Sequence, residues 1–232
     1  MARSRRLFPL KARLPRIPRV PRRRRSPEVA RTEILDAAER VFGEFQPDQV
    51  GLKEVGREAG VSHALITHYF GTYAGLLEAT LERRIRALRE RLLERLREAG
   101  ALSRPDELLA ILFRALEDPV HLRLMRWMLA SERPASVTAF GLQDHGLQLV
   151  AHQVAVAITP EVQGAPPHKL IVAIELALLT AVSAAYGYAL GKHALVGALG
   201  QRPSVELDAA VQRTLAAMLQ AYLRVEVGVA LP

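Results

Sequence analysis

The 232-residue sequence contains no cysteine, and only 5% of its residues are aromatic. Without cysteine the chain has neither a disulfide framework nor a thiolate metal site, and a reducing compartment is permitted. β-Branched clusters and alternating apolar and polar residues are also scarce, whereas Leu, Ala, Arg and Glu are abundant. Because that composition favours helices over strands, we predict an all-α fold.

The sequence also lacks the motifs of common catalytic sites, namely the nucleophile elbow, the phosphate-binding loop and HExxH. His145 and His152 are seven residues apart on one predicted helical face, which suits two ligands of a metal ion. No clear third ligand accompanies them. We therefore expect no enzyme, no metal and no cofactor.

Acidic residues are absent from residues 1–27, which carry eleven Arg and Lys. Subtracting these eleven cations from the net charge of +8 leaves −3 for the rest of the chain. Five prolines interrupt the same stretch, so residues 1–26 are predicted to form a disordered arm. A basic arm favours a polyanion, such as nucleic acid or an anionic membrane. A solvated tail, or translated sequence upstream of the true start, is the alternative.

Proline and glycine divide the remaining chain into helical segments. Ser26 and Pro27 provide an N-cap and a first-turn proline for a helix that ends before Pro47. Thr72 is predicted to cap a long helix from Tyr73 to about residue 98. Further helices are predicted at about 105–117, 119–131, 135–158, 168–199 and 204–226.

Residues 52–70 have the pattern of two short helices joined by a tight turn. Gly60 suits the left-handed position that ends a helix, and Ser62 is a good N-cap for the next one. Apolar residues recur at helical spacing on both sides of the turn. This is the helix-turn-helix pattern, whose second helix enters the DNA major groove. An ordinary αα-hairpin has the same pattern, so these residues alone leave both interpretations open.

With its neighbours, this hairpin resembles the DNA-binding domain of the TetR (tetracycline-repressor) family over about residues 28–80. The resemblance rests on Ile34-Leu35-Asp36-Ala37-Ala38, Val41-Phe42, Val55, Ala59-Gly60-Val61-Ser62, Tyr69-Phe70 and Leu76-Leu77. An actinobacterial-type subgroup is suggested by Ser62-His63-Ala64-Leu65 and His68-Tyr69-Phe70-Gly71.

The resemblance implies a three-helix DNA-binding domain over residues 27–72 and a larger helical regulatory and dimerisation domain over residues 73–232. It implies a cytoplasmic transcriptional regulator, most often a repressor, that binds a near-palindromic double-stranded operator as a homodimer and is released by a small molecule. By position, the recognition helix runs from Ser62 to Tyr69. The DNA-facing candidates are Lys53, Ser62, His63, Ala64, Leu65, Thr67, His68, Tyr69 and Tyr73.

Two positions depart from the family pattern. Gly51 stands where a capping Ser or Thr often bonds phosphate, and Tyr73 stands where a Lys commonly meets the DNA backbone. Residues 28–90 also hold only eight Arg and Lys against eleven Asp and Glu. We infer that the arginine arm supplies part of the missing phosphate contacts.

Deleting residues 1–25 is expected to flatten the salt dependence of DNA binding. Each neutralised phosphate contributes about −0.9 to the slope of log K against log salt, so losing the arm should change the slope by several units. The measurement is DNA affinity between low and physiological salt, and an unchanged slope would show that the arm makes no phosphate contacts.

The regulatory domain is expected to bind a partly apolar effector and to form the homodimer. Candidate pocket residues, apolar with a few polar groups, are Phe113, His121, Met125, Trp127, Met128, Phe140, His145, Tyr186 and His193. The dimer is predicted to use the last two helices, through the alanine ridge 173–189 and the stripe Leu207, Val211, Leu215, Met218 and Tyr222.

Residues 170–190 contain a single charge, Glu175, and are long enough to span a membrane. Few bulky residues and amphipathic surroundings favour a buried or interface helix, so no membrane partner is expected. Two other functions remain open: a nucleoid-type protein that binds DNA without sequence preference, and a membrane-associated helical protein.

Overall fold

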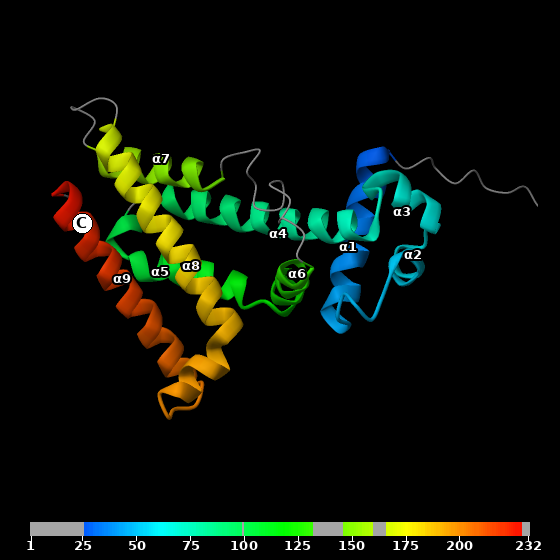
Figure 1. The fold of residues 1–232 in the computed structure, drawn as a ribbon. Helices are drawn as coiled ribbons and strands as arrows, with labels where there is room; N and C mark the ends of the chain where they lie inside the picture. Colours follow the sequence, from blue (N-terminus) through cyan, green and yellow to red (C-terminus); the bar gives the residue numbers. More distant parts are fainter. Residues whose placement is uncertain (1–25, 99, 132–145, 160–165, 229–232) are drawn as a thin grey trace, which may run out of the picture.

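The structure is a computed structural model that describes residues 26–98, 100–131, 146–159 and 166–228. Over these residues the chain is entirely helical, which confirms the predicted fold class (Figure 1). The elements are α1 (Pro27–Glu44), α2 (Leu52–Ala59), α3 (His63–Phe70), α4 (Tyr73–Leu96), the 3-10 turn η1 (Ala101–Ser103), α5 (Pro105–Leu116), α6 (Pro119–Ala130), α7 (Gly146–Ile158), α8 (His168–Ala198) and α9 (Val205–Val227). The first part of the segment predicted at 135–158 lies outside the described residues.

The first three helices gather at one end of the molecule (Figure 1). As the sequence predicts, Ser26 caps α1 by accepting a hydrogen bond from the Val29 amide at 3.3 Å, and Pro27 begins the helix. One face of α1 is buried against α2 and α4. Side chains with no exposed surface form the centre of this core: Ile34, Ala37, Ala38, Phe42, Val55, Ile66, Leu76 and Leu81.

The long helix α4 connects this bundle to the rest of the chain (Figure 1). Its first turns complete the core of α1–α3, and its later residues pack with α5 and α7. Three residues of α6 also belong to the first core, namely Leu124, Met125 and Met128. A hydrophobic cluster therefore crosses the predicted domain boundary between residues 72 and 73, and α6 joins it through contacts with α1 and α4.

The alanine ridge of α8 faces inward, which corrects the dimer contact predicted from the sequence. Its five alanines are at most 7% exposed within this single chain, where they pack against neighbouring helices. The i, i+4 spacing was interpreted correctly as a surface for close helix packing. The partner helices belong to the same chain, because α7, α5 and α9 all contact α8.

The predicted stripe on α9 is also mostly internal. Leu215 is buried, and Leu207, Val211 and Tyr222 pack against the clusters that α9 shares with α5 and α8. Met218 alone of this stripe is well exposed, at 64%. The exposed side of α8 and α9 is therefore formed mostly by residues other than those predicted for the dimer contact.

Among the described residues, α8 is the one helix long and apolar enough to cross a membrane by length and composition. The same test is passed by core helices of soluble proteins. The inward alanine ridge and the contacts of α8 with four other helices show that one face of α8 packs inside the protein, although only 33% of its apolar window is buried in the single chain.

Candidate functional site

The turn between α2 and α3 fixes where the second helix begins. Gly60 adopts the predicted left-handed conformation, with φ of 64°. The Val61 amide then donates to the Gly56 carbonyl at 2.9 Å, which folds the chain back. Ser62 caps α3 as expected, since its hydroxyl accepts from the Leu65 amide at 3.2 Å. These contacts build a helix-turn-helix with the predicted boundaries.

The outer face of α3 carries the polar candidates together. Ser62, His63, Ala64, Thr67 and His68 are exposed, so the structure brings these predicted residues onto one accessible surface. By contrast, Leu65 and Tyr69 are half-buried. Ile66 is fully buried, and it joins α3 to the core formed with α1 and α4. Exposed hydroxyl and imidazole groups on a short helix can donate to and accept from base edges and phosphates.

The predicted DNA contact by Tyr73 is not supported. Its hydroxyl donates to the Pro47 carbonyl at 2.7 Å, and its ring lies edge-on to Phe42. Burial, together with the nearby carboxylates of Glu54 and Asp48, raises the pKa of the phenol. Tyr73 therefore closes the core beneath the loop that follows α1, because its polar group is already bonded inside the domain.

Positive charges flank α3 on neighbouring helices. Lys53 is exposed on α2, as expected for a phosphate contact, and Arg57 is exposed one turn later on the same face. On α1, the Arg31 guanidinium lies 5.4 Å from the ring centre of Phe70, the last residue of α3. Neither Arg31 nor Arg57 is among the residues predicted from the sequence to face DNA. The i, i+4 spacing from Lys53 indicates Arg57, whereas Arg31 is recognisable only in three dimensions.

The junction of α3 and α4 sets the orientation of the recognition helix. Gly71 has φ of 69°, and Thr72 caps α4 by accepting from the Gly75 amide at 3.0 Å. Gly75 lies so close to the end of α3 that a Cβ there would be 2.2 Å from the Phe70 carbonyl oxygen. A glycine is thus required for α3 to meet α4 at this angle.

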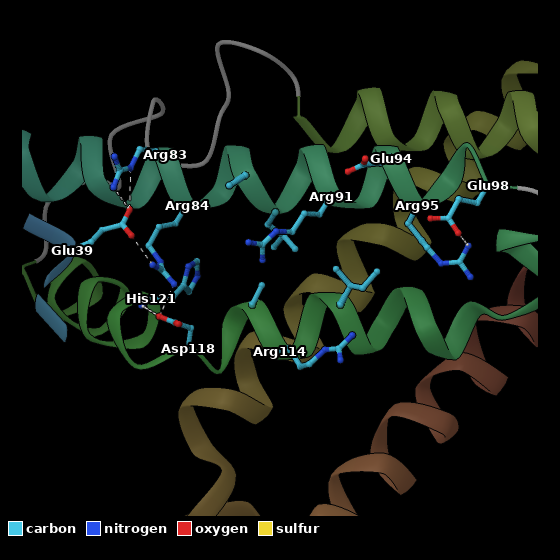
Figure 2. A pocket seen from close by; sticks show the side chains of 14 residues that line it. Glu39, Arg83, Arg84, Arg91, Glu94, Arg95, Glu98, Arg114, Asp118 and His121 are labelled. Atoms are coloured by element: carbon cyan, nitrogen blue, oxygen red, sulfur yellow. Dashed lines mark hydrogen bonds and ion pairs between the residues drawn. The ribbon is translucent and has the colours of Figure 1, made fainter. Parts of the chain in front are cut away.

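A chain of polar contacts connects α1 with the regulatory helices (Figure 2). Glu39 of α1 accepts from Arg83 at 2.6 Å and from Arg84 at 3.1 Å, both on α4. Arg84 also pairs with Asp118, the N-cap of α6, at 2.5 Å. In addition, Arg123 of α6 donates to the Phe42 and Gly43 carbonyls at the end of α1. The position of the DNA-binding helices is therefore coupled to α4 and α6.

His121 and Tyr186 form a buried polar pair at the inner end of this chain. The His121 Nε2 and Tyr186 hydroxyl are 2.8 Å apart, and the two rings stack. Burial lowers the pKa of His121 to about 4, helped by the charge of Arg84 and opposed by Asp118. His121 is thus neutral near pH 7.

The unfolding free energy is expected to fall as the pH drops from 6.5 to 4. In the unfolded chain His121 binds its proton near pH 6.5, whereas in the folded chain it does so near pH 4. Between pH 6.5 and pH 4 each pH unit lowers the unfolding free energy by about 1.4 kcal/mol, which gives a loss of about 3 kcal/mol in all. Urea unfolding of His121→Gln should lack this component, and His152→Gln, which is exposed on α7, should retain it. Equal pH profiles for the two variants would contradict the assignment.

An apolar cavity of about 780 Å³ lies among α4, α5, α6, α7 and α8. Its walls are mainly Leu, Ile, Val and Met, and the few polar groups include Gln148, Ser183 and Tyr186. This size and character are typical of small-molecule sites.

The structure places only part of the predicted pocket residues at this cavity. Met125 and Tyr186 line it, and His121 lies behind Tyr186. Three others are packing residues: Phe113 and Met128 are buried in cores, and Trp127 packs against one. His193 is exposed near the end of α8 and does not line this cavity. Phe140 and His145 lie outside the described residues.

Known proteins resemble this chain in two ways: by sequence in the region of the helix-turn-helix, and by structure over most of the fold. Residues 34–80 match the model of bacterial regulatory proteins, tetR family. The HTH-type transcriptional regulator BetI of Cronobacter sakazakii is 33% identical over 102 residues, 43% of this chain and 50% of that protein. BetI of Rhizobium meliloti is 38% identical over 88 residues, 38% of this chain and 43% of that protein. The chain thus matches half or less of the length of these relatives.

Solved structures resemble the chain over most of its length. A tetR-family transcriptional regulator from Streptomyces coelicolor has a TM-score of 0.57 and 24% identity, covering 85% of this chain and 83% of that one. The regulator FadR from Bacillus subtilis, solved with stearoyl-CoA, has a TM-score of 0.58 and 15% identity, covering 85% and 98%. These similarities establish the fold, whereas the actinobacterial-type subgroup stays a prediction.

Proposed function

We propose that this chain, whose residues 34–80 match the model of the tetR family of bacterial regulatory proteins, is a ligand-responsive repressor of that family that binds a near-palindromic operator as a homodimer. The observation that carries the proposal is the outer face of α3, where polar side chains are held exposed on a capped and buried helix. The relatives are transcriptional regulators, which supports a cytoplasmic, non-enzymatic role.

Sequence-specific binding is distinguished from nucleoid-type binding by competition. A specific regulator prefers its operator over random DNA by a factor of about 10³ or more at physiological salt. A ratio near one would instead favour a protein that binds through the basic arm. The exposed and varied hydrogen-bonding groups of α3 support the specific reader.

The apolar cavity is the proposed effector site. Its lining favours a ligand with an extended apolar part, and the related fold of FadR, solved with stearoyl-CoA, supports that class. Tyr186 lines the cavity and its hydroxyl is bonded to His121, and His121 belongs to α6, which contacts α1 through Arg123. An effector that moves Tyr186 would therefore act on α6 and the DNA-binding helices.

The homodimer is proposed to form through the open side of the α8–α9 pair. This side combines exposed leucines with small residues that allow close approach of two helices. On α8 they are Leu176, Ala184, Gly187 and Leu195, and on α9 they are Ala217, Met218, Ala221 and Val225.

Gly187→Arg is expected to separate the dimer without unfolding the protomer. Apart from the backbone of α8 itself, no atom of the described residues lies within 4 Å of a Cβ at this position, so the larger side chain fits a single chain but blocks a second copy. Sedimentation velocity at micromolar concentration should show the monomer mass and at least a tenfold weaker association. Gly187→Ala, which adds one methyl group, is the matched control and should remain dimeric. A dimeric Gly187→Arg protein would place the interface elsewhere.

A further inference from the structure

A second cavity, of about 760 Å³, lies between α4 and the helices α5 and α6 and is lined by arginines (Figure 2). We call it the arginine groove; its cations are Arg83, Arg84, Arg91 and Arg95 from α4 and Arg114 from α5. Leu88 lines both this groove and the apolar cavity. The remaining lining of the groove has a different character, so it is a site of its own.

Three of these arginines, Arg83, Arg84 and Arg95, are ion-paired with carboxylates inside the protein. Arg83 pairs with Asp36 and Glu39, and Arg95 pairs with Glu98 and Glu107. Arg91 forms no ion pair with a carboxylate of the described residues, and Figure 2 shows it extending from α4 toward α5. Arg114 donates to the Ala110 carbonyl of its own helix at 3.2 Å and likewise forms no such ion pair. In the described part of the chain, Arg91 and Arg114 are therefore free of ion pairs, and with Glu94 also in the lining the groove holds five arginines against four carboxylates, a net charge of +1.

Arg84 adds a hydrogen-bond donor that the protein leaves unused. Its terminal nitrogens hold Glu39 and Asp118, but its Nε is buried and has no partner among the described residues. Buried N–H groups nearly always have an acceptor, so the Nε of Arg84 is a donor that gains a partner if the side chain shifts toward the groove.

We propose that the arginine groove binds the phosphate groups of a small phosphorylated organic molecule. Guanidinium groups match phosphate oxygens in charge and geometry, and a phosphate has enough acceptors for several of them. Arg91 and Arg114 provide the free charge, and Arg84 provides the buried donor. Ala87, Leu88, Ile111 and Ala115 give the groove an apolar wall for the organic part.

Binding in the groove acts on α1 through Arg84. A phosphate that engages Arg84 competes with Glu39, whose bonds to α4 hold the DNA-binding helices in place. The bound anion therefore loosens α1 from α4. The effect on DNA rests on the proposed regulatory function, whereas binding of the anion does not.

Calorimetric titration of the full chain with inorganic pyrophosphate at constant ionic strength tests the site. Arg91→Gln should bind at least ten times more weakly than the unmodified protein. Arg86→Gln is the matched control, because Arg86 is exposed on the same helix, pairs with Glu82 and does not line the groove. The absence of millimolar binding, or equal weakening in both variants, would overturn the proposal.

Glu39→Gln tests the competition. With the carboxylate removed, pyrophosphate should bind severalfold more tightly, provided that a thermal melt shows that Glu39→Gln is folded. If Glu39→Gln does not fold, Glu39→Asp is used instead. Because Glu39→Asp keeps the charge, it should bind pyrophosphate no more tightly than the unmodified chain. Unchanged affinity in Glu39→Gln, or tighter binding in Glu39→Asp, would overturn the competition.

In a mobility shift, pyrophosphate should release DNA from the unmodified protein more readily than from Arg91→Gln. Failure to bind DNA at all would contradict the proposed function and leave the anion site standing.

Discussion

Replacing Gly75 with alanine is expected to lower the free energy of unfolding by about 3 kcal/mol, at the upper end of the usual cost of overpacking. The new Cβ would be placed 2.2 Å from the Phe70 carbonyl oxygen, a main-chain atom at the end of α3. A flexible side chain could turn aside, but this oxygen moves only if α3 moves. Operator binding should therefore fail together with stability.

Urea unfolding monitored by circular dichroism measures this effect. Gly197→Ala is the matched control, since no atom lies within 4 Å of a Cβ at that position of α8. There the substitution should be neutral or stabilise by up to about 1 kcal/mol, through the better helix propensity of alanine. A Gly75→Ala protein as stable as the unmodified chain would show that the α3–α4 junction tolerates a side chain.

The second large effect concerns the face of α3 itself. The triple variant His63→Ala, Thr67→Ala, His68→Ala removes the exposed imidazoles and one hydroxyl and leaves the buried Ile66 in place. Each base contact contributes about 1–3 kcal/mol of discrimination, so operator affinity should fall by about a hundredfold or more. Stability should change little, because these side chains are exposed and alanine favours helices.

Binding to operator and to random DNA, each measured by fluorescence anisotropy, separates the two contributions. The triple variant should lose the operator preference and keep its weak affinity for random DNA, which depends on phosphate contacts. His152→Ala with Gln153→Ala, on the exposed side of α7, is the control and should bind as the unmodified chain does. A triple variant that still prefers the operator would place the reading surface outside α3.

The helices were predictable because their signals are local. Caps such as Ser26, Ser62 and Thr72, and the left-handed Gly60, determine the ends of helices through contacts within a few residues. The buried face of α1 follows from the spacing of its apolar residues alone. The predicted boundaries of α2 and α3 are confirmed for the same reason.

The direction in which a face points was not predictable in the same way. The alanine ridge of α8 was identified correctly as a packing surface, but its spacing does not say whether the partner helix is in the same chain or in a second copy. Tyr73 has a comparable ambiguity, since its hydrogen bond to Pro47 joins residues 26 positions apart. The ion pair between Glu39 and Arg84 joins residues 45 positions apart, and no local sequence pattern indicates it.

Selection of bound duplexes from a random DNA pool by the full-length protein tests the central claim most directly. We predict that the selected sequences share a near-palindromic site with two equivalent half-sites, because a symmetric dimer presents two copies of α3. We also predict that the triple α3 variant enriches no sequence under the same conditions. Selected pools without a common motif for the unmodified protein would contradict the account of α3 as a sequence reader.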